Sequence, residues 1–506
     1  MKKTAAVSMV VLLTAYTDAT ALVRGYCVDM ARLDAWRDVA GRTGCRLEIA
    51  PDAREAMFLE DSPWPEPGWS RSIPIDTTPA WSSSEDYAVG GLCWCDVDGD
   101  GDLDLISAHY EGGYPVRPEQ TRIWFNSGST LESSAGWVGT DAQWSTDVTA
   151  GDIDGDGDFD LAVADWGTNV IHGHNGVTLE TAPSWVSSEG LFSLSAVLGD
   201  VSGAAAPVYL ELFIANQAVY PDPGQPNHLY DNSAGIPVPS ASWTSGDIAQ
   251  NMAAALGDYD EDGVSGVLVP WTGDGVRRCF STGALLPIHS VVSVSVDSSP
   301  VQNFSVQYSG GWLLLRQPPA AGAVILMACE RSTDLDAAVA VDHGNAKVYN
   351  DLGETYEGTP SFVVSGTGDR REKGVAWVDV DGDGDLDLFV GGRDVPMHLY
   401  ENVAGVLSTT ASWSSDDTGP DLSDLDWIDV DGDGDLDLAT SNTTKAPVFR
   451  IYENLDGTLE TTPSWGLPWS GSMANAVAWG DMNNDGWPDL AVAYAGAPIQ
   501  VYLNTS

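Results

Sequence analysis

The stretch WVDVDGDGDLDLFVGG, residues 377–392, places five aspartates on alternate positions between Asp379 and Asp387. Like charges this close repel one another by about 1 kcal/mol per contact even in water, and by more where solvent is excluded. The flanking residues are apolar and β-prone, which favours a turn between two strands over a disordered acidic tract. A folded turn of this composition predicts a bound cation.

The acidic pattern recurs along the chain. The loops begin at Asp96, Asp152, Asp200, Asp258, Ala328, Asp379, Asp429 and Asp481. Their spacings are 56, 48, 58, 70, 51, 50 and 52 residues. A period near fifty indicates a repeat architecture with eight repeat positions, and it replaces the length-based expectation of about three domains.

Each repeat also carries a third strand, such as RIWFNSG or HLYENVAG, and a tryptophan segment such as TLETTPSW. Four short strands per unit predict an all-β propeller of seven to eight four-stranded blades. Residues 73–86 supply a tryptophan segment with no blade before it, whereas the C-terminal IQVYLNTS is a third strand with no such segment after it. We expect the N-terminal strand to complete the last blade and close the ring.

On these loops and strands, residues 73–506 resemble the FG-GAP, or integrin-α-like, propeller repeats and the related VCBS-type repeats of secreted microbial proteins. The resemblance implies that a loop D-x-[DN]-x-[DN]-G-x-x-D joins the first two strands of a blade and binds calcium (Ca²⁺). Five loops match this pattern. The matching residues are Asp96, Asp98, Asp100 and Asp104; Asp152, Asp154, Asp156 and Asp160; Asp379, Asp381, Asp383 and Asp387; Asp429, Asp431, Asp433 and Asp437; and Asp481, Asn483, Asp485 and Asp489.

The residues themselves also favour calcium, which takes six to eight hard oxygen ligands around a turn that a glycine allows to bend. The bend glycines are Gly101, Gly157, Gly384, Gly434 and Gly486. The residue after each would add its backbone carbonyl; these are Asp102, Asp158, Asp385, Asp435 and Trp487. An EF-hand would need a glutamate where Val390 stands, and magnesium prefers stricter geometry. Five calcium sites are expected, with unoccupied solvated turns as the alternative.

The remaining loops are degenerate. The loop with Asp258, Asp260 and Asp262 has Gly266 in place of the final aspartate, so a weaker sixth site is expected there. No metal is expected at the other two loops. Their residues are Asp200, Ser202, Ala204 and Val208, and Ala328, Glu330, Ser332 and Asp336.

Charge and the N-terminus restrict partners and location. Residues 1–72 hold 9 basic and 10 acidic residues, so residues 73–506 carry −51 of the net −52. This charge disfavours nucleic acid and anionic membranes as partners.

Residues 1–21 have the charged, apolar and small-residue regions of a secretory signal. A secreted or cell-surface protein is expected, or a periplasmic one, without a transmembrane segment; an ordinary buried N-terminal segment is the alternative.

Two segments do not fit the repeat. Residues 22–72 predict a short helix from about Met30 to Ala40 and a proline-rich linker, without an assigned function. Residues 291–328 predict a β-hairpin insertion.

The preferred disulfide pairs are Cys279 with Cys329 and Cys27 with Cys45. Small core residues are expected at Cys93 and Cys95.

No linear catalytic motif is present, and the calcium loops account for nearly every acidic cluster. The leading interpretation is a secreted binding or adhesion module for an extracellular glycan or protein. An extracellular polysaccharide-active enzyme, either a hydrolase or a lyase, and a structural spacer or assembly unit are the alternatives.

The loops between second and third strands should lie on the face opposite the calcium loops. Their candidate ligand contacts are His109, Tyr110, Asp165, Trp166, Asn216, Trp271, His343, Arg393, Asn442 and Tyr494. We expect ligand near the central channel, with Trp166, Trp271 and Arg393 among its contacts. Packing between blades is expected of Trp81, Trp94, Trp185, Trp243, Trp377, Trp413, Trp427, Trp465 and Trp479.

Overall fold

A computed structural model gives the fold of most of the chain. It describes residues 73–111, 118–203, 208–218, 224–283, 286–353, 355–364, 371–416, 421–443, 448–467 and 473–506. Nearer the N-terminus it describes the backbone of β1 (Met9–Thr14), β2 (Cys27–Val28) and β3 (Arg46–Ile49), which form a sheet in the order β2-β1-β3. The helix expected near Met30–Ala40 lies outside the described residues. In the part of the chain that is described, no helix is long and apolar enough to cross a bilayer.

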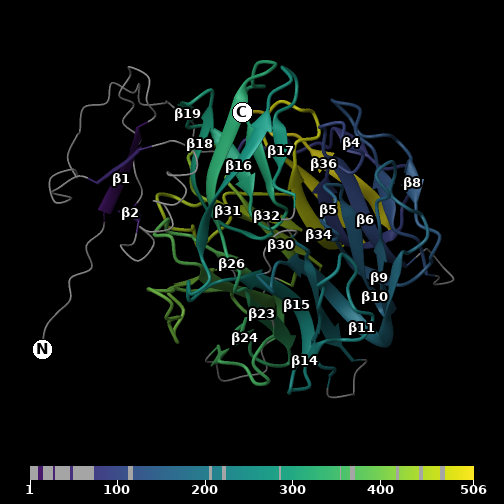
Figure 1. The fold of residues 1–506 in the computed structure, drawn as a ribbon. Helices are drawn as coiled ribbons and strands as arrows, with labels where there is room; N and C mark the ends of the chain where they lie inside the picture. Colours follow the sequence, from purple (N-terminus) through teal and green to yellow (C-terminus); the bar gives the residue numbers. More distant parts are fainter. Residues whose placement is uncertain are drawn as a thin grey trace, which may run out of the picture.

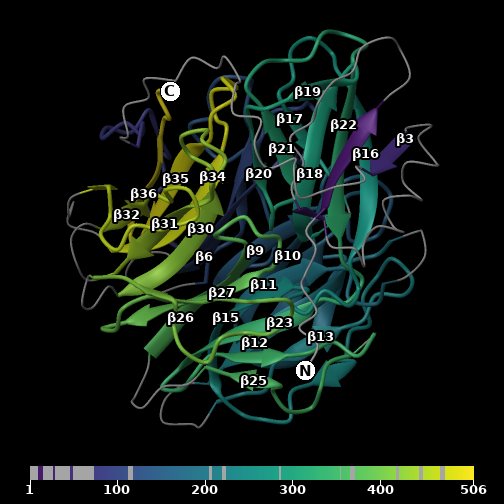
Figure 2. The same cartoon turned by 90° about the vertical axis from the view of Figure 1, so that its left-hand side faces the viewer.

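Three blades are separate four-stranded antiparallel sheets (Figures 1 and 2). Blade 1 contains β5 (Ala88–Cys95), β6 (Asp104–Glu111), β7 (Arg122–Trp124) and β8 (Trp137–Val138). Blade 6 contains β30 (Leu422–Ile428), β31 (Asp437–Asn442), β32 (Phe449–Tyr452) and β33 (Trp465–Leu467). Blade 7 contains β34 (Ala474–Gly480), β35 (Asp489–Tyr494), β36 (Ala497–Tyr502) and β4 (Trp81–Ser82).

The other blades share sheets in pairs. Blades 2 and 3 are joined by β11 (Trp185–Gly199), whose first part pairs with β10 (Asp160–His172) in blade 2 and whose second part pairs with β12 (Glu211–Gln217) in blade 3. The other strands are β9 (Ser145–Gly151) in blade 2, and β13 (His228–Tyr230) and β14 (Trp243–Thr244) in blade 3. Blade 4 contains β15 (Gln250–Gly257), β23 (Asp336–Asp342), β24 (Lys347–Tyr349) and β25 (Phe362–Val363). Blade 5 contains β26 (Arg371–Val378), β27 (Asp387–Arg393), β28 (His398–Tyr400) and β29 (Trp413–Ser414).

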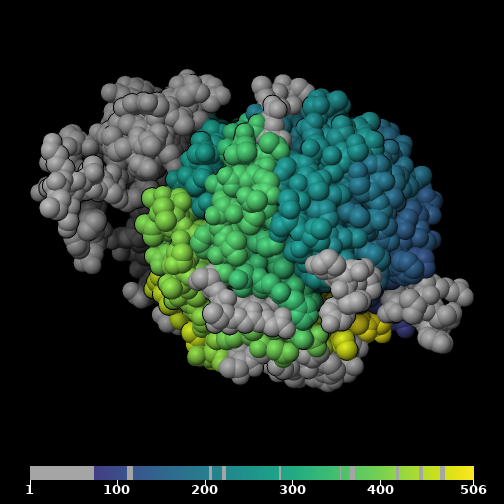
Figure 3. Space-filling model, turned by 90° about the horizontal axis from the view of Figure 1, so that it is seen from below, coloured from purple at the N-terminus to yellow at the C-terminus, as the bar shows by residue number. Residues whose placement is uncertain are grey.

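The blades close into a ring. Their inner strands contact one another in the cyclic order β5, β9, β11, β15, β26, β30, β34 and back to β5. β4 pairs with β36, with Trp81 opposite Val501, so the predicted closure of the last blade by the N-terminal strand is confirmed. Figure 3 shows blue, teal, green and yellow-green parts of the chain side by side, in their order along the sequence.

The ring has seven blades among the described residues, and the eighth repeat position is not a separate blade. β15 ends at Gly257, and its partner in the blade is β23, whose Asp336 lies opposite Gly257. The fourth and fifth repeat positions are therefore the two halves of blade 4. Counting the loop that begins at Ala328 as a separate repeat was wrong, because Val324–Arg331 belongs to an insertion between these halves.

The insertion, residues 265–331, is wider than the predicted 291–328, and we call it the cap. Its strands are β16 (Ser265–Thr272), β17 (Cys279–Ser281), β18 (Ile288–Val296), β19 (Ser299–Val301), β20 (Phe304–Gln307), β21 (Trp312–Leu315) and β22 (Val324–Arg331). They form the sheets β16-β22-β18-β19 and β17-β21-β20 over a common apolar core. Figures 1 and 2 both place these strands together on the upper side of the ring.

The predicted disulfide between Cys279 and Cys329 is wrong, because both thiols are free. Cys279 lies in the three-stranded sheet of the cap and packs into the core of the ring, whereas Cys329 lies in the other sheet and packs within the cap. Cys93 and Cys95 are also free, and Cys95 is buried. The pairing of Cys27 with Cys45 falls outside the described residues.

The recurring tryptophans link neighbouring blades, as predicted. On the outer strands, indole N–H groups donate to backbone carbonyls of the next blade: Trp81 to Glu132 (3.2 Å), Trp185 to Pro237 (2.7 Å) and Trp465 to Ile75 (3.1 Å). On an inner strand, the ring of Trp94 covers Gly480, where an added Cβ would lie 2.4 Å from the indole. Only glycine allows this close approach between blades 1 and 7.

Carboxylates on the inner strands make further links between blades. Asp426 Oδ2 accepts from the backbone N–H of Trp479 (3.1 Å) in blade 7, and its Oδ1 accepts from Gln307 Nε2 (2.5 Å) in the cap. Asp424 and Asp147 make the same kind of bond to the inner strand of the next blade. Burial raises the pKa of Asp426 to about 7. These carboxylates tie together inner strands that do not pair as a sheet.

Asp426→Ala should destabilise the protein by about 1–3 kcal/mol, because it leaves the Trp479 amide and the Gln307 side chain without an acceptor. Urea denaturation measures the loss. Asp86→Ala, at an exposed aspartate, is the control and should change the free energy of unfolding by less than about 0.5 kcal/mol. Equal effects of the two substitutions would contradict the link.

Candidate functional site

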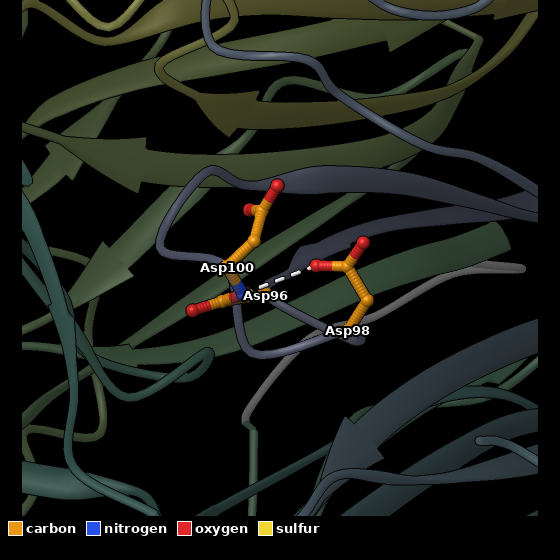
Figure 4. Close-up of side chains that lie close together, drawn as sticks. All are labelled: Asp96, Asp98 and Asp100. Atoms are coloured by element: carbon orange, nitrogen blue, oxygen red, sulfur yellow. Dashed lines mark hydrogen bonds between the residues drawn. The ribbon is translucent and has the colours of Figure 1, made fainter. Parts of the chain in front are cut away.

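The acidic loops join the first and second strands of the blades and lie at one end of the ring. Figure 4 shows Asp96, Asp98 and Asp100 at the turn between β5 and β6, with Asp98 Oδ1 accepting from the backbone N–H of Asp100 (3.1 Å). Five loops bring three carboxylate oxygens within 4.8 Å of one another. They are Asp96, Asp98 and Asp100; Asp152, Asp154 and Asp156; Asp258, Asp260 and Asp262; Asp379, Asp381 and Asp383; and Asp429, Asp431 and Asp437.

A glycine makes each bend, as the sequence predicts. In blade 5, Gly384 has a φ of 97°, a conformation that other residues rarely adopt, and its N–H donates to Asp379 Oδ2 (3.0 Å). The equivalent bond to the first aspartate recurs in four other blades, from Gly157, Gly263, Gly434 and Gly486. The bend therefore aims the first carboxylate into the loop.

The final aspartate of each loop holds the loop closed. Asp104 is fully buried; its Oδ2 accepts from the N–H of Val97 (3.0 Å) inside the loop, and its Oδ1 from the N–H of Asn126 (2.8 Å) after the third strand. Asp160, Asp437 and Asp489 make the same pair of bonds. Because each oxygen keeps a further lone pair, this role is compatible with metal coordination.

An asparagine after the third strand links neighbouring loops, and sequence analysis missed it. Asn126 Nδ2 donates to Met482 O (2.9 Å) in the loop of the preceding blade, and Asn402 Nδ2 donates to Tyr259 O (2.7 Å) in the same way. Asn232, Asn454 and Asn504 repeat this bond. The signal in the sequence is the asparagine that ends the third-strand motifs FN, DN, EN and LN.

The loop of blade 4 is complete, contrary to the sequence-based assignment. Asp336 Oδ2 accepts from the N–H of Tyr259 (3.2 Å), and Oδ1 from the N–H of Asp351 (3.0 Å), which is the bonding pattern of Asp104. The final aspartate is therefore Asp336, and Gly266 instead lies in β16 of the cap. Asp336 had been assigned to a separate degenerate repeat.

In the loop of blade 3, the residue at the final position differs from the one that the sequence alignment assigned. Glu211, and not Val208, takes the final position, because its Oε2 accepts from the N–H of Val201 (2.9 Å). The first carboxylate, Asp200, accepts from Arg331 Nη1 (3.2 Å) of the cap. A guanidinium stands beside the acidic group in this blade.

The cap contacts other loops through its remaining basic residues. Arg277 Nη2 donates to Gly99 O (3.2 Å) and lies 3.6 Å from Asp96 Oδ2, in blade 1. Arg278 donates to the carbonyl of Asn484, in blade 7. Arg316 donates to the carbonyl of Gly486, and its guanidinium lies 3.8 Å from the ring centroid of Trp487. With Arg331, all four basic residues of the cap contact acidic loops.

The loop residues fit a calcium ion. Their donors are hard carboxylate and backbone oxygens, and Oδ1 atoms of Asp96 and Asp152 are buried without a hydrogen-bond partner. In blade 5, burial and then the Asp383 carboxylate raise the pKa of Asp379 to about 7. Converging, partly desolvated carboxylates of this kind are stabilised by a nearby positive charge.

The ten candidate ligand residues do not form one site. Five are buried and belong to the interior: His109, Asp165, Asn216, Asn442 and Tyr494. Trp271 lies on β16 of the cap, where its indole donates to Ser281 O (2.7 Å), whereas Trp166 lies on β10 of blade 2. Arg393 Nε lies 3.4 Å from Asp421 Oδ1. The Tyr110 hydroxyl accepts a hydrogen bond from Asn475 Nδ2 (3.1 Å).

Trp166 and His343 do come together. They line a pocket of about 300 Å³ with Phe192, Gln217, Ala218, Gln250 and Asp342, at the ends of strands opposite the acidic loops. A second cavity of about 1450 Å³ is the central channel, which is lined by inner strands of all seven blades and by cap residues such as His289 and Gln307.

Comparison with known proteins supports the repeat. Residues 96–163, 379–440 and 429–492 match the sequence model of the FG-GAP-like repeat, so the chain carries FG-GAP-like repeats at these three regions. Two structures that align with it are described as crystal structures of BBS1N in complex with ARL6DN, soaked with mercury or with lead. They are 11% and 10% identical, cover 86% of this chain and 98% and 99% of their own, and have TM-scores of 0.49. No curated protein sequence gives a significant match.

The ion pair between Arg331 and Asp200 should stabilise the docked cap. In a double-mutant cycle with Arg331→Met and Asp200→Asn, we expect a coupling energy of about 1–2 kcal/mol in thermal or urea denaturation, because the Asp200 side chain is only 4% exposed.

The exposed pair of Arg393 and Asp394 is the matched control, since both side chains are more than a third exposed. Its coupling energy should be below about 1 kcal/mol. A coupling at Arg331 no larger than this control would mean that the cap does not depend on the pair.

Proposed function

We propose that the protein is an exported, calcium-binding β-propeller that acts as a binding module for an extracellular glycan or protein. The observation that carries the calcium assignment is the loop of blade 5, where Asp379, Asp381 and Asp383 bring carboxylate oxygens within 4.8 Å of one another. No described basic side chain forms an ion pair with this loop. Calcium, with its preference for several hard oxygens, suits this arrangement.

Six loops are proposed to hold calcium. They are the five that match the repeat motif and the loop of blade 4, in which Asp258, Asp260 and Asp262 are completed by Asp336. The bound ion would supply positive charge that offsets repulsion within the loop. In blade 3 the loop has only two carboxylates, Asp200 and Glu211, and Arg331 Nη1 lies 3.2 Å from Asp200 Oδ2, so no ion is proposed there.

Binding is favoured over catalysis by the state of the carboxylates. Glycoside hydrolysis needs two carboxyl groups free to act on a sugar from both sides of a bond. The channel carboxylates Asp147, Asp424 and Asp426 accept backbone N–H bonds on both oxygens. The loop carboxylates are assigned to the proposed calcium ions. The proposed export rests on the signal-like residues 1–21.

Removing calcium with a chelator should lower the melting temperature. A site filled at a hundredfold excess over its Kd stabilises the native state by about 2.7 kcal/mol. Atomic emission should find about six calcium ions per chain. An unchanged melting curve after exhaustive chelation would contradict the proposal.

Single substitutions assign the ions to loops. Asp379→Ala and Asp336→Asn should each remove one ion, whereas Asp200→Ala should remove none, because Arg331 already pairs with Asp200. Asp86→Asn is the control for loss of an exposed carboxylate. Full metal content in folded Asp336→Asn would show that blade 4 does not bind calcium.

A further inference from the structure

Two exposed tryptophans lie side by side on the face opposite the acidic loops. Trp144 and Trp166 are each 38% exposed, and they are the exposed aromatic side chains among the described residues. Their ring centroids are 6.4 Å apart, and the Trp166 ring lies 5.8 Å from that of Phe192 in an edge-to-face contact. Large aromatic rings left in water by a folded chain mark contact surfaces more often than chance.

The strand register fixes this aromatic group at the edge of a pocket. Trp166 in β10 lies opposite Phe192 in β11, and Phe192 lies opposite Gln217 in β12. In the neighbouring blade 4, Gln250 in β15 lies opposite Asp342 in β23. Blades 2, 3 and 4 thus each contribute to one cavity of about 300 Å³. This volume is at the lower end of the range for small-molecule sites.

The lining of the pocket combines an aromatic wall with groups that donate or accept hydrogen bonds. Gln217 and Gln250 carry amides, and Asp342 and His343 add a carboxylate and an imidazole. Asp342 Oδ2 lies 3.6 Å from Lys373 Nζ, so the local charges compensate one another. The net charge of −51 on residues 73–506 also repels anions. The chemistry therefore suits a neutral, hydroxyl-rich ring with one apolar face.

We infer that this pocket, walled by Trp166 and Phe192 and lined by Gln217, Gln250, Asp342 and His343, binds a neutral pyranose unit of a glycan. The apolar C–H face of the sugar stacks on Trp166, and its hydroxyl groups bond to the amides and the carboxylate. The inference rests on the proposed binding function and names its ligand class and site. The pocket is too small for more than one ring-sized group, so longer glycans extend across the surface beside Trp144.

Saturation-transfer NMR on the full, calcium-loaded chain tests the pocket with three probes. These are methyl β-D-glucopyranoside, methyl β-D-galactopyranoside and methyl α-D-mannopyranoside at millimolar concentration. At least one should receive saturation, strongest at the C–H protons of one ring face. Trp166→Ala should weaken its affinity by about tenfold or more, and Trp166→Phe should weaken it less, because a smaller aromatic face remains.

Trp271→Ala, in the cap, is the matched control and should leave the affinity unchanged. Melting curves and calcium content of each variant separate misfolding from loss of binding. Unchanged affinity in folded Trp166→Ala would overturn the inference while leaving the calcium-binding propeller intact. Saturation of N-acetylphenylalaninamide without saturation of any glycoside would overturn the sugar class and assign the pocket to a side chain of a protein partner.

Discussion

Repulsion among the loop carboxylates is the constraint on which the rest of the structure depends. Residues 73–506 carry a net charge of −51, and the acidic loops gather much of that charge at one end of the ring. Two features of the structure reduce the repulsion among these carboxylates. Backbone N–H groups point at the first and final aspartates of each loop, as at Asp379 and Asp104, and the cap brings its four arginines onto the loops of blades 1, 3 and 7. The proposed calcium ions would act on the charge that remains.

The same loops also take part in hydrogen bonds between neighbouring blades. An asparagine of one blade donates into the loop of the preceding blade, as Asn126 does to Met482 O, while tryptophans of the outer strands donate to the following blade, as Trp185 does to Pro237 O. Asp426 adds a link between inner strands. Each blade is a small sheet that buries little surface alone, so these repeated links help the ring to behave as one cooperative unit. A loop that is held firmly therefore stabilises more than its own blade.

The repeat period, the four strands of a blade, the glycine bends and the closure by Trp81 could be predicted, because each depends on local sequence that recurs. The errors arise where the fold joins distant residues. Asp336 completes a loop that begins 78 residues earlier (336 − 258), across the cap, so a local alignment assigned it to a separate blade. Glu211 was missed because three extra residues shift the alignment of blade 3. Five of the ten candidate ligand residues are buried for another reason. Position at a strand end does not reveal burial, and side chains such as Asp165 turn inward to bond with the scaffold.

The two faces of the ring differ in what they can still bind. On the loop face, cap residues contact blades 1, 3, 6 and 7, through Arg277, Arg331, Ser305 and Arg278, and so occupy surface that a ligand would otherwise reach. The opposite face has no such insertion among the described residues, and it presents Trp144 and Trp166 to solvent. Surface loops there can change without disturbing the charge balance of the acidic loops. The division leaves the loop face to hold the ring together, and leaves the opposite face exposed to solvent for the proposed ligand.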